Sequence, residues 1–458
     1  GLGRALDLGP REIAALADED ANWHWNSAWE GHHAEALAPI IDTLEASPDV
    51  TDQDKQLLSR LRCALIEPPQ KPADIQTAEA ILRAGLDRLE GGDPSPGRAR
   101  LLRTLGWVTG HAQRHEEAVS LLEQAIAEAR ACSDDWTLRW ALMDMAMNVC
   151  FVEGLADGLE LIEESYRLAL EANDQGLIHR YRNNMPWIRT ELGESPEPSV
   201  SLFKEGLARA RREAEGGSDV SFAFNLAIAY SWMGRLGDAL THIDEAISTA
   251  RAIAGESDDW LLVDRAVIHR LRGEIAAAEG DEAELERRAY EPPLQLAYVW
   301  LIERAWAEWP RDPAAALREL TAYLERDDPQ VDTRGEVPYG IGRIALRLGD
   351  FDVVRRAVEQ HRRTRRFGNQ VLPAMYGRVD GLITDDDGIT LEAAATALEA
   401  RDYIWHSLEA WADAALLAAR ADRPSVAQER ALAITERTGM HHLLGPLPET
   451  RWIPLQSR

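Results

Sequence analysis

The amino-acid sequence predicts an all-α fold, a right-handed superhelical solenoid of about ten to eleven stacked helix pairs. Ala, Leu, Glu and Arg dominate almost every segment, and apolar residues recur at intervals of three and four, which is the period of an α-helix. Short clusters rich in Gly, Pro and Asp, such as 91–94 and 291–293, separate the helical segments without forming a long linker. One pattern of small and apolar residues also repeats along the chain. The length of 458 residues therefore indicates one array of stacked units and not about three separate domains.

The repeating pattern is clearest in two segments. In each, a large apolar residue is followed by a small one, and small or apolar residues return 12, 16 and 19 positions after the small residue. The two copies contain Leu105, Gly106, Ala118, Leu122 and Ala125, and Leu226, Ala227, Ala239, Ile243 and Ala246. Small residues at this spacing allow two antiparallel helices to approach closely where they cross.

A second sign of repetition is the sequence Ser-Asp-Asp-Trp. It ends at Trp136 and again at Trp260, and in both places a new helix is expected to start. The two tryptophans are 124 residues apart, which is three units of about 41 residues. In both places the Ser, or an Asp after it, is expected to cap the following helix. In the segment between them, Pro186 replaces the usual small residue, so we expect a kink or a local opening of its helix.

We expect residues 1–458 to form one solenoid. The repeating pattern is clearer in some segments than in others, and on this basis the solenoid has five parts. Residues 1–96 form irregular N-terminal helix pairs, and residues 97–290 contain the best-defined repeats. Residues 291–340 form an irregular pair, residues 341–440 contain the C-terminal repeats, and residues 441–458 are a tail.

The pattern resembles the tetratricopeptide repeat. Because the units are longer than the standard 34 residues of that repeat, they are similar to the repeat region of MalT-like, ATP-binding transcription regulators of the LuxR type and of related bacterial signalling ATPases and cyclases. The segment that ends in Thr438-Gly439-Met440 looks like the final repeats of those families. Their ATPase has no counterpart here, since no GxxxxGK[ST] sequence occurs, and only isolated arginines follow residue 440. The chain begins at Gly1, which suggests a trimmed or excised fragment.

The resemblance implies a binding function. Tetratricopeptide arrays often bind peptides along the concave face made by the first helix of each pair, so the partner expected here is a protein or peptide in that groove, with a small ligand as an alternative. The clamp that such arrays use for chaperone tails needs a Lys and an Asn four residues apart. Arg103 and Trp107 occupy those positions here, which argues against a chaperone tail.

Composition excludes several other classes of protein. The chain has 78 acidic against 50 basic residues and a net charge of -28, which argues against direct nucleic-acid binding and against binding to an anionic membrane. No apolar run of about 18 residues occurs, so no membrane span is expected. Cys63, Cys132 and Cys150 show no CxxC spacing, which favours a reduced, cytoplasmic protein without a structural metal.

Three patterns that could carry chemistry have plainer interpretations. The sequence from Gly340 to Ala345 has the outline of a dinucleotide fingerprint, but no strand precedes it and the repeat pattern makes Gly342 a helix-crossing position. The acidic run that ends at Gly388 lacks the Glu of a calcium loop, which favours a turn and a helix cap. His111 and His115 are interpreted as a surface pair and not as metal ligands. We therefore expect no cofactor, no metal and no enzymatic activity.

Candidate binding residues lie where a first helix is richer in polar or aromatic side chains than packing demands. There are four such cases. Consecutive Trp and polar residues occur near residue 25, Asn and Arg residues occur around Pro186, and Asn148 and Asn225 are further polar residues of first helices. Nine arginines against three acids between residues 343 and 378 give a local charge of +6. The candidates are Trp23, Trp25, Asn26, Asn148, Arg180, Arg182, Asn183, Asn184, Asn225, Arg343, Arg347, Arg362 and Arg366. Ordinary packing is the alternative for the Asn residues. A solvated helix face, or docking against the acidic remainder of the array, is the alternative for the arginine-rich segment.

These observations predict a non-catalytic scaffold that binds a protein, peptide or small ligand, as the sensor or regulatory region of a bacterial signalling or transcription-regulatory protein. The alternative is a self-association module that drives formation of a homo-oligomer through exposed Trp side chains and the arginine-rich segment.

Overall fold

The computed structural model describes residues 72–89, 91–152, 155–213, 216–254, 259–288, 290, 300–302, 304–305, 312–324, 336–364, 373–383 and 387–440. Every regular element in these ranges is an α-helix, so the predicted all-α fold is confirmed. No helix in them is both long and apolar enough to cross a membrane. The chain divides into two compact units, Gly1–Arg182 and Asn183–Arg458. That residues 1–458 form one solenoid, with the five parts given above, stays a prediction.

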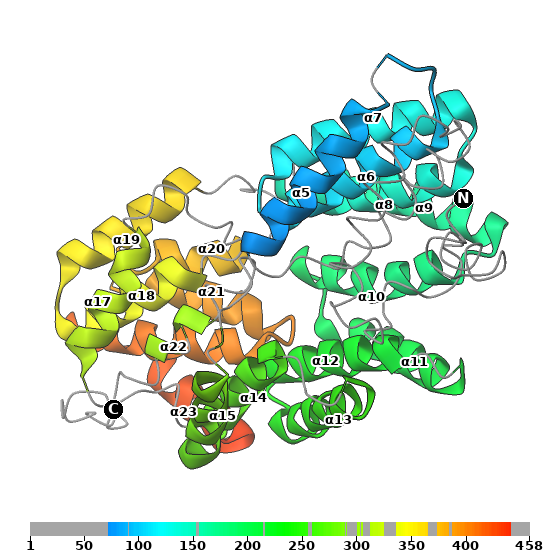
Figure 1. Ribbon diagram of the computed structural model, residues 1–458. Helices are drawn as coiled ribbons and strands as arrows, with labels where there is room; N and C mark the ends of the chain where they lie inside the picture. The colour runs from blue at the N-terminus through cyan, green and yellow to red at the C-terminus, as the bar shows by residue number, and fades with distance from the viewer. Residues whose placement is uncertain are drawn as a thin grey trace. The chain divides into compact units, whose positions relative to one another are not determined.

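The first unit is a stack of helix pairs. Its helices are α5 (Pro72–Asp87), α6 (Pro96–His111), α7 (His115–Cys132), α8 (Asp135–Val152) and α9 (Leu155–Ala172), and α10 (Gln175–Glu191) begins in this unit and ends in the next. Figure 1 shows α5 to α9 side by side. Each helix from α5 to α8 packs against the next one along the chain. The turns between them are short, so consecutive helices are antiparallel.

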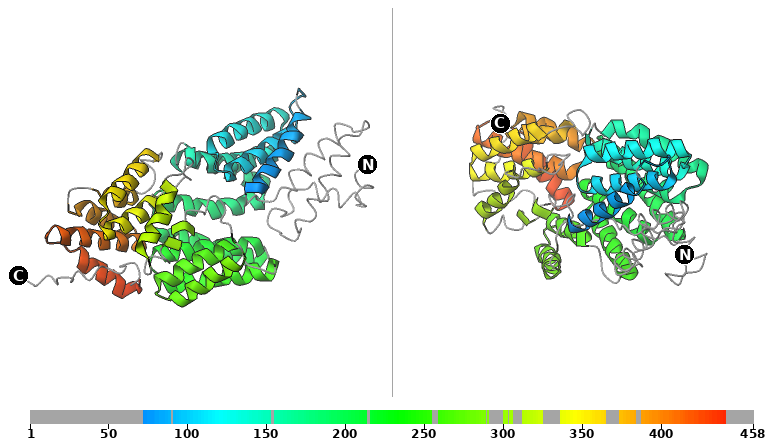
Figure 2. Two further views of the ribbon diagram at one scale, coloured as in Figure 1. Left: turned by 60° about the vertical axis from the view of Figure 1, so that its left-hand side comes forward. Right: turned by 45° about the horizontal axis from the view of Figure 1, so that its top comes forward.

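The second unit continues the same arrangement. Its helices are α11 (Pro196–Glu213), α12 (Gly216–Trp232), α13 (Leu236–Ala254), α14 (Asp259–Leu271), α15 (Ile275–Arg287), α17 (Pro313–Leu324), α18 (Glu336–Leu348), α19 (Phe351–Thr364), α20 (Pro373–Asp380), α21 (Ile389–Glu399), α22 (Ile404–Arg420) and α23 (Ala427–Thr438). In the left view of Figure 2 the helices α12 to α15, coloured green, lie together as one group, and each of α12 to α14 packs against the next helix. The helix α10 runs through Pro186 without interruption.

The turns explain where each helix begins. Ser133 ends α7 in the left-handed conformation, with φ of 57°, and Asp134 caps α8, because the backbone N–H of Thr137 donates to Asp134 Oδ1 at 3.2 Å. Asp174 caps α10 in the same way, accepting from the N–H of Leu177 at 3.1 Å. The Asp after the Ser, and not the Ser itself, therefore starts the helix at this turn.

Small residues lie at the helix crossings, as the repeating pattern predicts. A Cβ atom on Gly106 would come within 2.6 Å of Leu122 Cγ, so α6 and α7 could not cross so closely with any other residue there. A Cβ atom on Gly342, in α18, would come within 2.4 Å of Leu382 Cδ1, in the turn that follows α20. Close packing therefore requires a glycine at this position as well.

The first helices of successive pairs contact one another. In the first unit α6 contacts α8, and in the second unit α12 contacts α14 and α18 contacts α20. In a curved stack of helix pairs, the helices that approach each other most closely lie on the inner side of the curve. We call each such row a first-helix face.

Within the second unit, the C-terminal repeats also contact a much earlier part of the chain. The hydroxyl of Tyr403, just before α22, faces the carbonyl oxygens of Thr190 and Glu194, the latter at 3.0 Å. The hydroxyl of Ser195 donates to Asp402 Oδ2 at 2.8 Å. The ring of Trp232, at the end of α12, stacks on Tyr403 with centroids 6.0 Å apart. We call this the Tyr403 contact.

Candidate functional site

An arginine–aspartate–arginine row crosses three first helices of the first unit. Arg103 on α6 donates from Nε to Asp144 Oδ2 on α8 at 2.7 Å, and Arg180 on α10 forms an ion pair with Asp144 Oδ1, also at 2.7 Å. Burial alone would raise the pKa of Asp144, but the two arginines outweigh burial and hold that pKa below its usual value. The carboxylate is therefore ionised and fixed between two cations.

Two tryptophan rings of α8 cover these arginines. The rings of Trp136 and Trp140 stack with centroids 5.7 Å apart. The guanidinium carbon of Arg103 lies 5.2 Å from the centroid of Trp136 and 4.9 Å from that of Trp140, and Arg180 lies 5.7 Å from Trp140. Each such cation–π contact is worth about 0.5 to 2 kcal/mol, more when it is desolvated. Arginine and tryptophan planes are thus held together on rigid helices.

The members of this row differ in how far they reach solvent. The side chain of Asp144 is 0% exposed and that of Arg103 is 8% exposed, whereas the side chain of Arg180 is 22% exposed. Trp136 and, on α6, Trp107 are also partly exposed. A molecule that approaches this face therefore meets a guanidinium and indole rings, while the balancing carboxylate lies beneath them. We call Arg103, Trp136, Trp140, Asp144 and Arg180 the Arg–Trp face.

Other ion pairs link the same helices through their buried caps. Arg100 Nε donates to Asp134 Oδ2 at 3.3 Å, and Arg139 Nε donates to Asp174 Oδ2 at 2.8 Å. Trp140 Nε1 also donates to Asp174 Oδ2, at 3.0 Å. Each capping aspartate thus receives an arginine from the preceding first helix, which ties successive repeats together.

The predicted residue Asn148 and the histidine pair lie beside the Arg–Trp face. Asn148 is buried, with Oδ1 3.0 Å from His115 Nδ1 and Nδ2 donating to the carbonyl of Asp144. His115 is only 8% exposed, so the prediction of a surface pair is wrong for that residue. Nδ1 of His111 faces the carbonyl of Trp107, and burial lowers the pKa of His111, which favours a neutral ring at pH 7. Among the described residues no group of three or more His, Cys, Asp or Glu side chains could hold a metal ion.

The predicted residues around Pro186 fall into two groups. In the first unit, Arg180 belongs to the Arg–Trp face, and Nη1 of Arg182 is buried without a hydrogen-bond partner among the described residues. In the second unit, Asn225 Nδ2 on α12 donates to Asn183 Oδ1 on α10 at 2.7 Å. Asn183 Nδ2 faces Asn184 Oδ1 at 3.5 Å, so three of the five predicted Asn residues, Asn183, Asn184 and Asn225, lie together.

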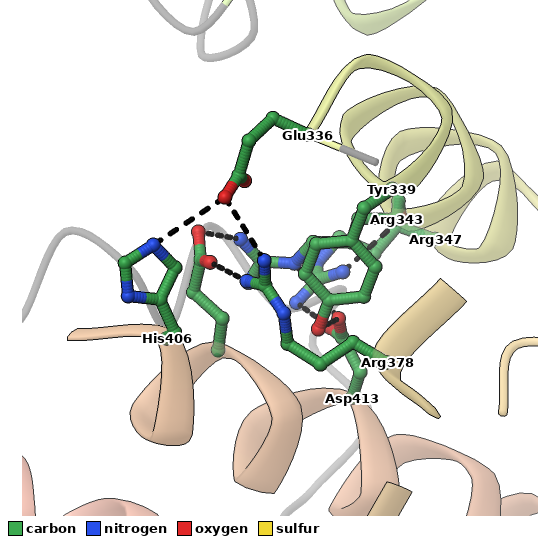
Figure 3. A network of polar contacts seen from close by, with 8 residues as sticks. Glu336, Tyr339, Arg343, Arg347, Arg378, His406 and Asp413 are labelled. Atoms are coloured by element: carbon green, nitrogen blue, oxygen red, sulfur yellow. Dashed lines mark hydrogen bonds and ion pairs between the residues drawn. The ribbon is translucent and has the colours of Figure 1, made fainter. Parts of the chain in front are cut away.

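Figure 3 shows where the predicted Arg343 and Arg347 lie, in a buried network on the first helices of the second unit. Arg343 on α18 donates from Nε to Asp413 Oδ2 at 2.8 Å and from Nη1 to Glu409 Oε1 at 2.7 Å, both on α22. Arg347 Nη2 forms an ion pair with Asp413 Oδ1 at 2.8 Å. The arginines of this segment that are buried therefore dock against acids of a later repeat.

Helix α20 and two further side chains complete this network. Arg378 donates to Glu409 Oε2 at 2.8 Å and to Glu336 Oε1 at 3.0 Å, so three arginines face three carboxylates. The hydroxyl of Tyr339 donates to Asp413 Oδ2 at 2.8 Å, and burial raises the pKa of Tyr339 well above its usual value. His406 Nε2 lies 3.4 Å from Glu336 Oε1. The charges balance inside the network, which leaves it no net charge to attract an ion from solvent.

The remaining predicted residues lie elsewhere. Arg362 is exposed on α19 and forms an ion pair with Asp380 at 2.7 Å. Trp23, Trp25, Asn26 and Arg366 lie outside the described residues. The sequence analysis overlooked Asp144, Trp136 and Trp140 as members of a site. The sequence does contain a pattern that indicates this pair. Arg103 and Asp144 carry opposite charges and are 41 residues apart, which is the length of one repeat.

Comparison with known proteins finds one family whose sequence pattern matches a segment of the chain. Residues 225–259, which include the last part of α12 and all of α13, match the family described as tetratricopeptide repeat. This segment of the chain is therefore similar to one tetratricopeptide repeat. No curated protein matches the chain. The resemblance to the repeat region of MalT-like regulators is not shown by these comparisons.

Two solved structures are similar to the chain at low identity. A Rap protein complexed with competence and sporulation factor is 13% identical, with 95% of this chain and 99% of that chain covered and a TM-score of 0.32. BtubC (BKLC) from P. vanneervenii is 17% identical, with 62% of this chain and 93% of that chain covered and a TM-score of 0.24. At these TM-scores neither likeness supports a statement about function.

Proposed function

We propose that this tetratricopeptide-repeat chain is a non-catalytic scaffold that binds a protein or peptide on the Arg–Trp face. The observation that carries the proposal is the arrangement of Arg103, Asp144 and Arg180 across three first helices, with two indole rings stacked against the guanidinium groups. Aromatic planes and arginines on rigid elements are the side chains that dominate protein interfaces.

The exposure of these side chains indicates the chemistry of the partner. Arg180 is the outer cation and Asp144 the inner, fully buried acid. Arg103 alone can keep Asp144 paired, so Arg180 can turn part of its guanidinium toward a ligand. We therefore expect a partner segment with a carboxylate or an acidic side chain, flanked by apolar groups that lie on Trp136.

A selection from a displayed library of random peptides tests this function. The protein should enrich peptides that contain an acidic residue, and Arg180→Ala should weaken their binding at least tenfold. Arg167→Ala is the matched control, because Arg167 is an exposed arginine on the second helix α9 of the same unit. Enrichment that is the same for Arg180→Ala and for the unaltered protein would contradict the proposal.

The setting of this function is part of the proposal. We infer that the chain is the sensor or regulatory region of a larger bacterial cytoplasmic protein, of the signalling or transcription-regulatory kind. Small rotations between neighbouring repeats change the curvature of such an array, so an occupied groove can act on an attached domain. Self-association of the chain is the alternative, and light scattering separates the two. A mass that stays that of a monomer at every concentration would exclude self-association.

A further inference from the structure

Asp264, on the first helix α14 of the second unit, differs from the acids around it. Asp281 faces Arg265 at 2.6 Å, and Asp259 faces Arg288 at 2.8 Å. The Asp264 carboxylate forms no hydrogen bond or ion pair with any residue that the structure describes. Desolvation raises the pKa of Asp264 to about 7, although part of the residue still reaches solvent. It is a carboxylate surrounded by protein but accessible from outside.

Aromatic side chains accompany this carboxylate. Trp260 lies one helical turn before Asp264, so the two residues share a face of α14. The ring of Phe224 meets Trp260 edge-on, with centroids 4.2 Å apart and an angle of 89°. All three residues are partly exposed. Because the face of an aromatic ring is electron-rich, this surface attracts cations.

Tyr290 adds a polar atom to the same place. Its hydroxyl is buried and has no hydrogen-bond partner in the described part of the chain. Burial raises the pKa of Tyr290, and the charges of Asp259 and Asp264 raise it further, which places the phenol within electrostatic range of both acids. The ring of Trp300 meets Tyr290 edge-on at 5.6 Å. A carboxylate and a hydroxyl that have no hydrogen-bond partner among the described residues thus occur together with aromatic rings.

We propose that Asp264, Trp260 and Tyr290 form a binding site for an organic cation, the guanidinium or alkylammonium group of a basic side chain in a partner peptide. A carboxylate that is desolvated in the empty protein has already incurred the cost of burial, so an arriving cation restores the missing pair. The indole face and the phenol oxygen then supply the second and third contacts. This site goes beyond the Arg–Trp face, because it lies in the other unit and takes the opposite charge.

Other ligands fit this site less well. A hard metal ion such as Ca²⁺ requires several oxygen ligands, and the described residues hold no group that could provide them. An acidic peptide would be repelled by Asp264. A neutral apolar group would leave the carboxylate buried without a partner, which is unfavourable.

Isothermal titration calorimetry at pH 8 tests the site, with a capped Gly-Gly-Arg-Gly-Gly peptide as the probe. We expect this peptide to bind and the same peptide with neutral citrulline in place of arginine to bind at least tenfold more weakly. Asp264→Asn should weaken binding of the arginine peptide at least tenfold, and Trp260→Leu should weaken this binding severalfold. Asp238→Asn is the matched control, because Asp238 is an acid of the second helix α13 that pairs with Arg235.

The outcomes separate the alternatives. Equal binding of the arginine and citrulline peptides, or equal binding by Asp264→Asn and the unaltered protein, would overturn the cation site. Agmatine, which is the free amine that carries the same guanidinium, distinguishes the source of the cation. Binding of agmatine as tight as that of the peptide would overturn the peptide part of the proposal. A negative result here leaves the Arg–Trp face untouched, because Arg180→Ala tests that face separately.

Discussion

Arg343 and Asp413 form an ion pair at 2.8 Å in which the two side chains are 1% and 0% exposed. They belong to α18 and α22, which are separated in the sequence by the three helices α19, α20 and α21. Pairing charges so far from water is costly. Glu409 supports the pair by accepting a second hydrogen bond from Arg343, and Tyr339 and Arg347 contact the two carboxylate oxygens of Asp413. The arginine-rich segment thus serves the packing of the C-terminal repeats.

We expect Arg343→Met to lower the free energy of unfolding by about 3 kcal/mol or more, because it leaves Asp413 and Glu409 buried with one cation fewer. Urea unfolding followed by circular dichroism measures the change. Arg362→Met is the control, since its ion pair with Asp380 is half exposed and should be worth less than about 1 kcal/mol. Equal losses for the two variants would show that burial of the Arg343 pair has no energetic weight.

The pH dependence of stability reports on Asp264. Its pKa rises from about 3.9 in the unfolded chain to about 7 in the folded protein, so between these values the folded protein holds the extra proton. Stability should therefore fall as pH rises from about 4 to 7, by up to about 1.4 kcal/mol per pH unit from this group. Asn cannot ionise, so Asp264→Asn should be more stable than the unaltered protein at pH 8 and equally stable near pH 4. Thermal unfolding across that range checks the prediction, and parallel curves would refute it.

Two glycines in helices should respond oppositely to alanine. A Cβ atom on Gly158 would lie 2.7 Å from the backbone carbonyl oxygen of Ala146 and would also overlap the Cys150 sulfur. Gly158→Ala should therefore destabilise the protein by about 1 to 3 kcal/mol. Gly280, inside α15, has no atom within 4 Å of such a Cβ, so Gly280→Ala should stabilise it by about 0.5 to 1 kcal/mol. Unfolding in urea measures both, and changes of the same sign would contradict this packing.

Removing one hydroxyl tests the Tyr403 contact. Tyr403→Phe removes one donor from the carbonyl oxygens of Thr190 and Glu194. The Thr190 oxygen keeps the N–H of Gly193 at 2.9 Å, so the cost should be about 1 kcal/mol. Hydrogen exchange should become faster at the turn between α10 and α11. Tyr166→Phe is the control, because the ring of Tyr166 stacks on Tyr181 but its hydroxyl makes no described hydrogen bond. Unchanged exchange at that turn in Tyr403→Phe would mean that the hydroxyl does not hold the contact.

The features that the sequence predicts are those encoded within one repeat. Gly106 and Leu122 lie 16 residues apart, and a close helix crossing requires a small residue opposite a large one, so the pattern alone reveals the pair. The charge contrast around Arg343 is also visible in the sequence. Its partners are not, because Glu409 and Asp413 lie 66 and 70 residues away among 78 acidic residues.

The candidate binding sites were partly predictable for the same reason. Arg180 was recognised from the unusual sequence around Pro186, and the first helices were recognised as the place to search. Asp264 is an ordinary acid in the sequence. Its distinguishing property is that it has no partner in the part of the chain that the structure describes, which only the packing of α14 reveals. The Asn183–Asn225 pair, one repeat apart, could have been found from the period alone.

The Tyr403 contact has a consequence for how the second unit folds. In a linear array each repeat depends only on its neighbours, so the last pair can fray without disturbing the rest. The hydrogen bond between Tyr403 and Thr190 instead joins residues 213 positions apart. Closing so long a loop costs chain entropy, and the contact can form only after the helices on both sides of it have folded. The start of the final helix pair is consequently fixed to the turn between α10 and α11. We expect α10 to α12 and α21 to α22 to melt together, in a single cooperative transition.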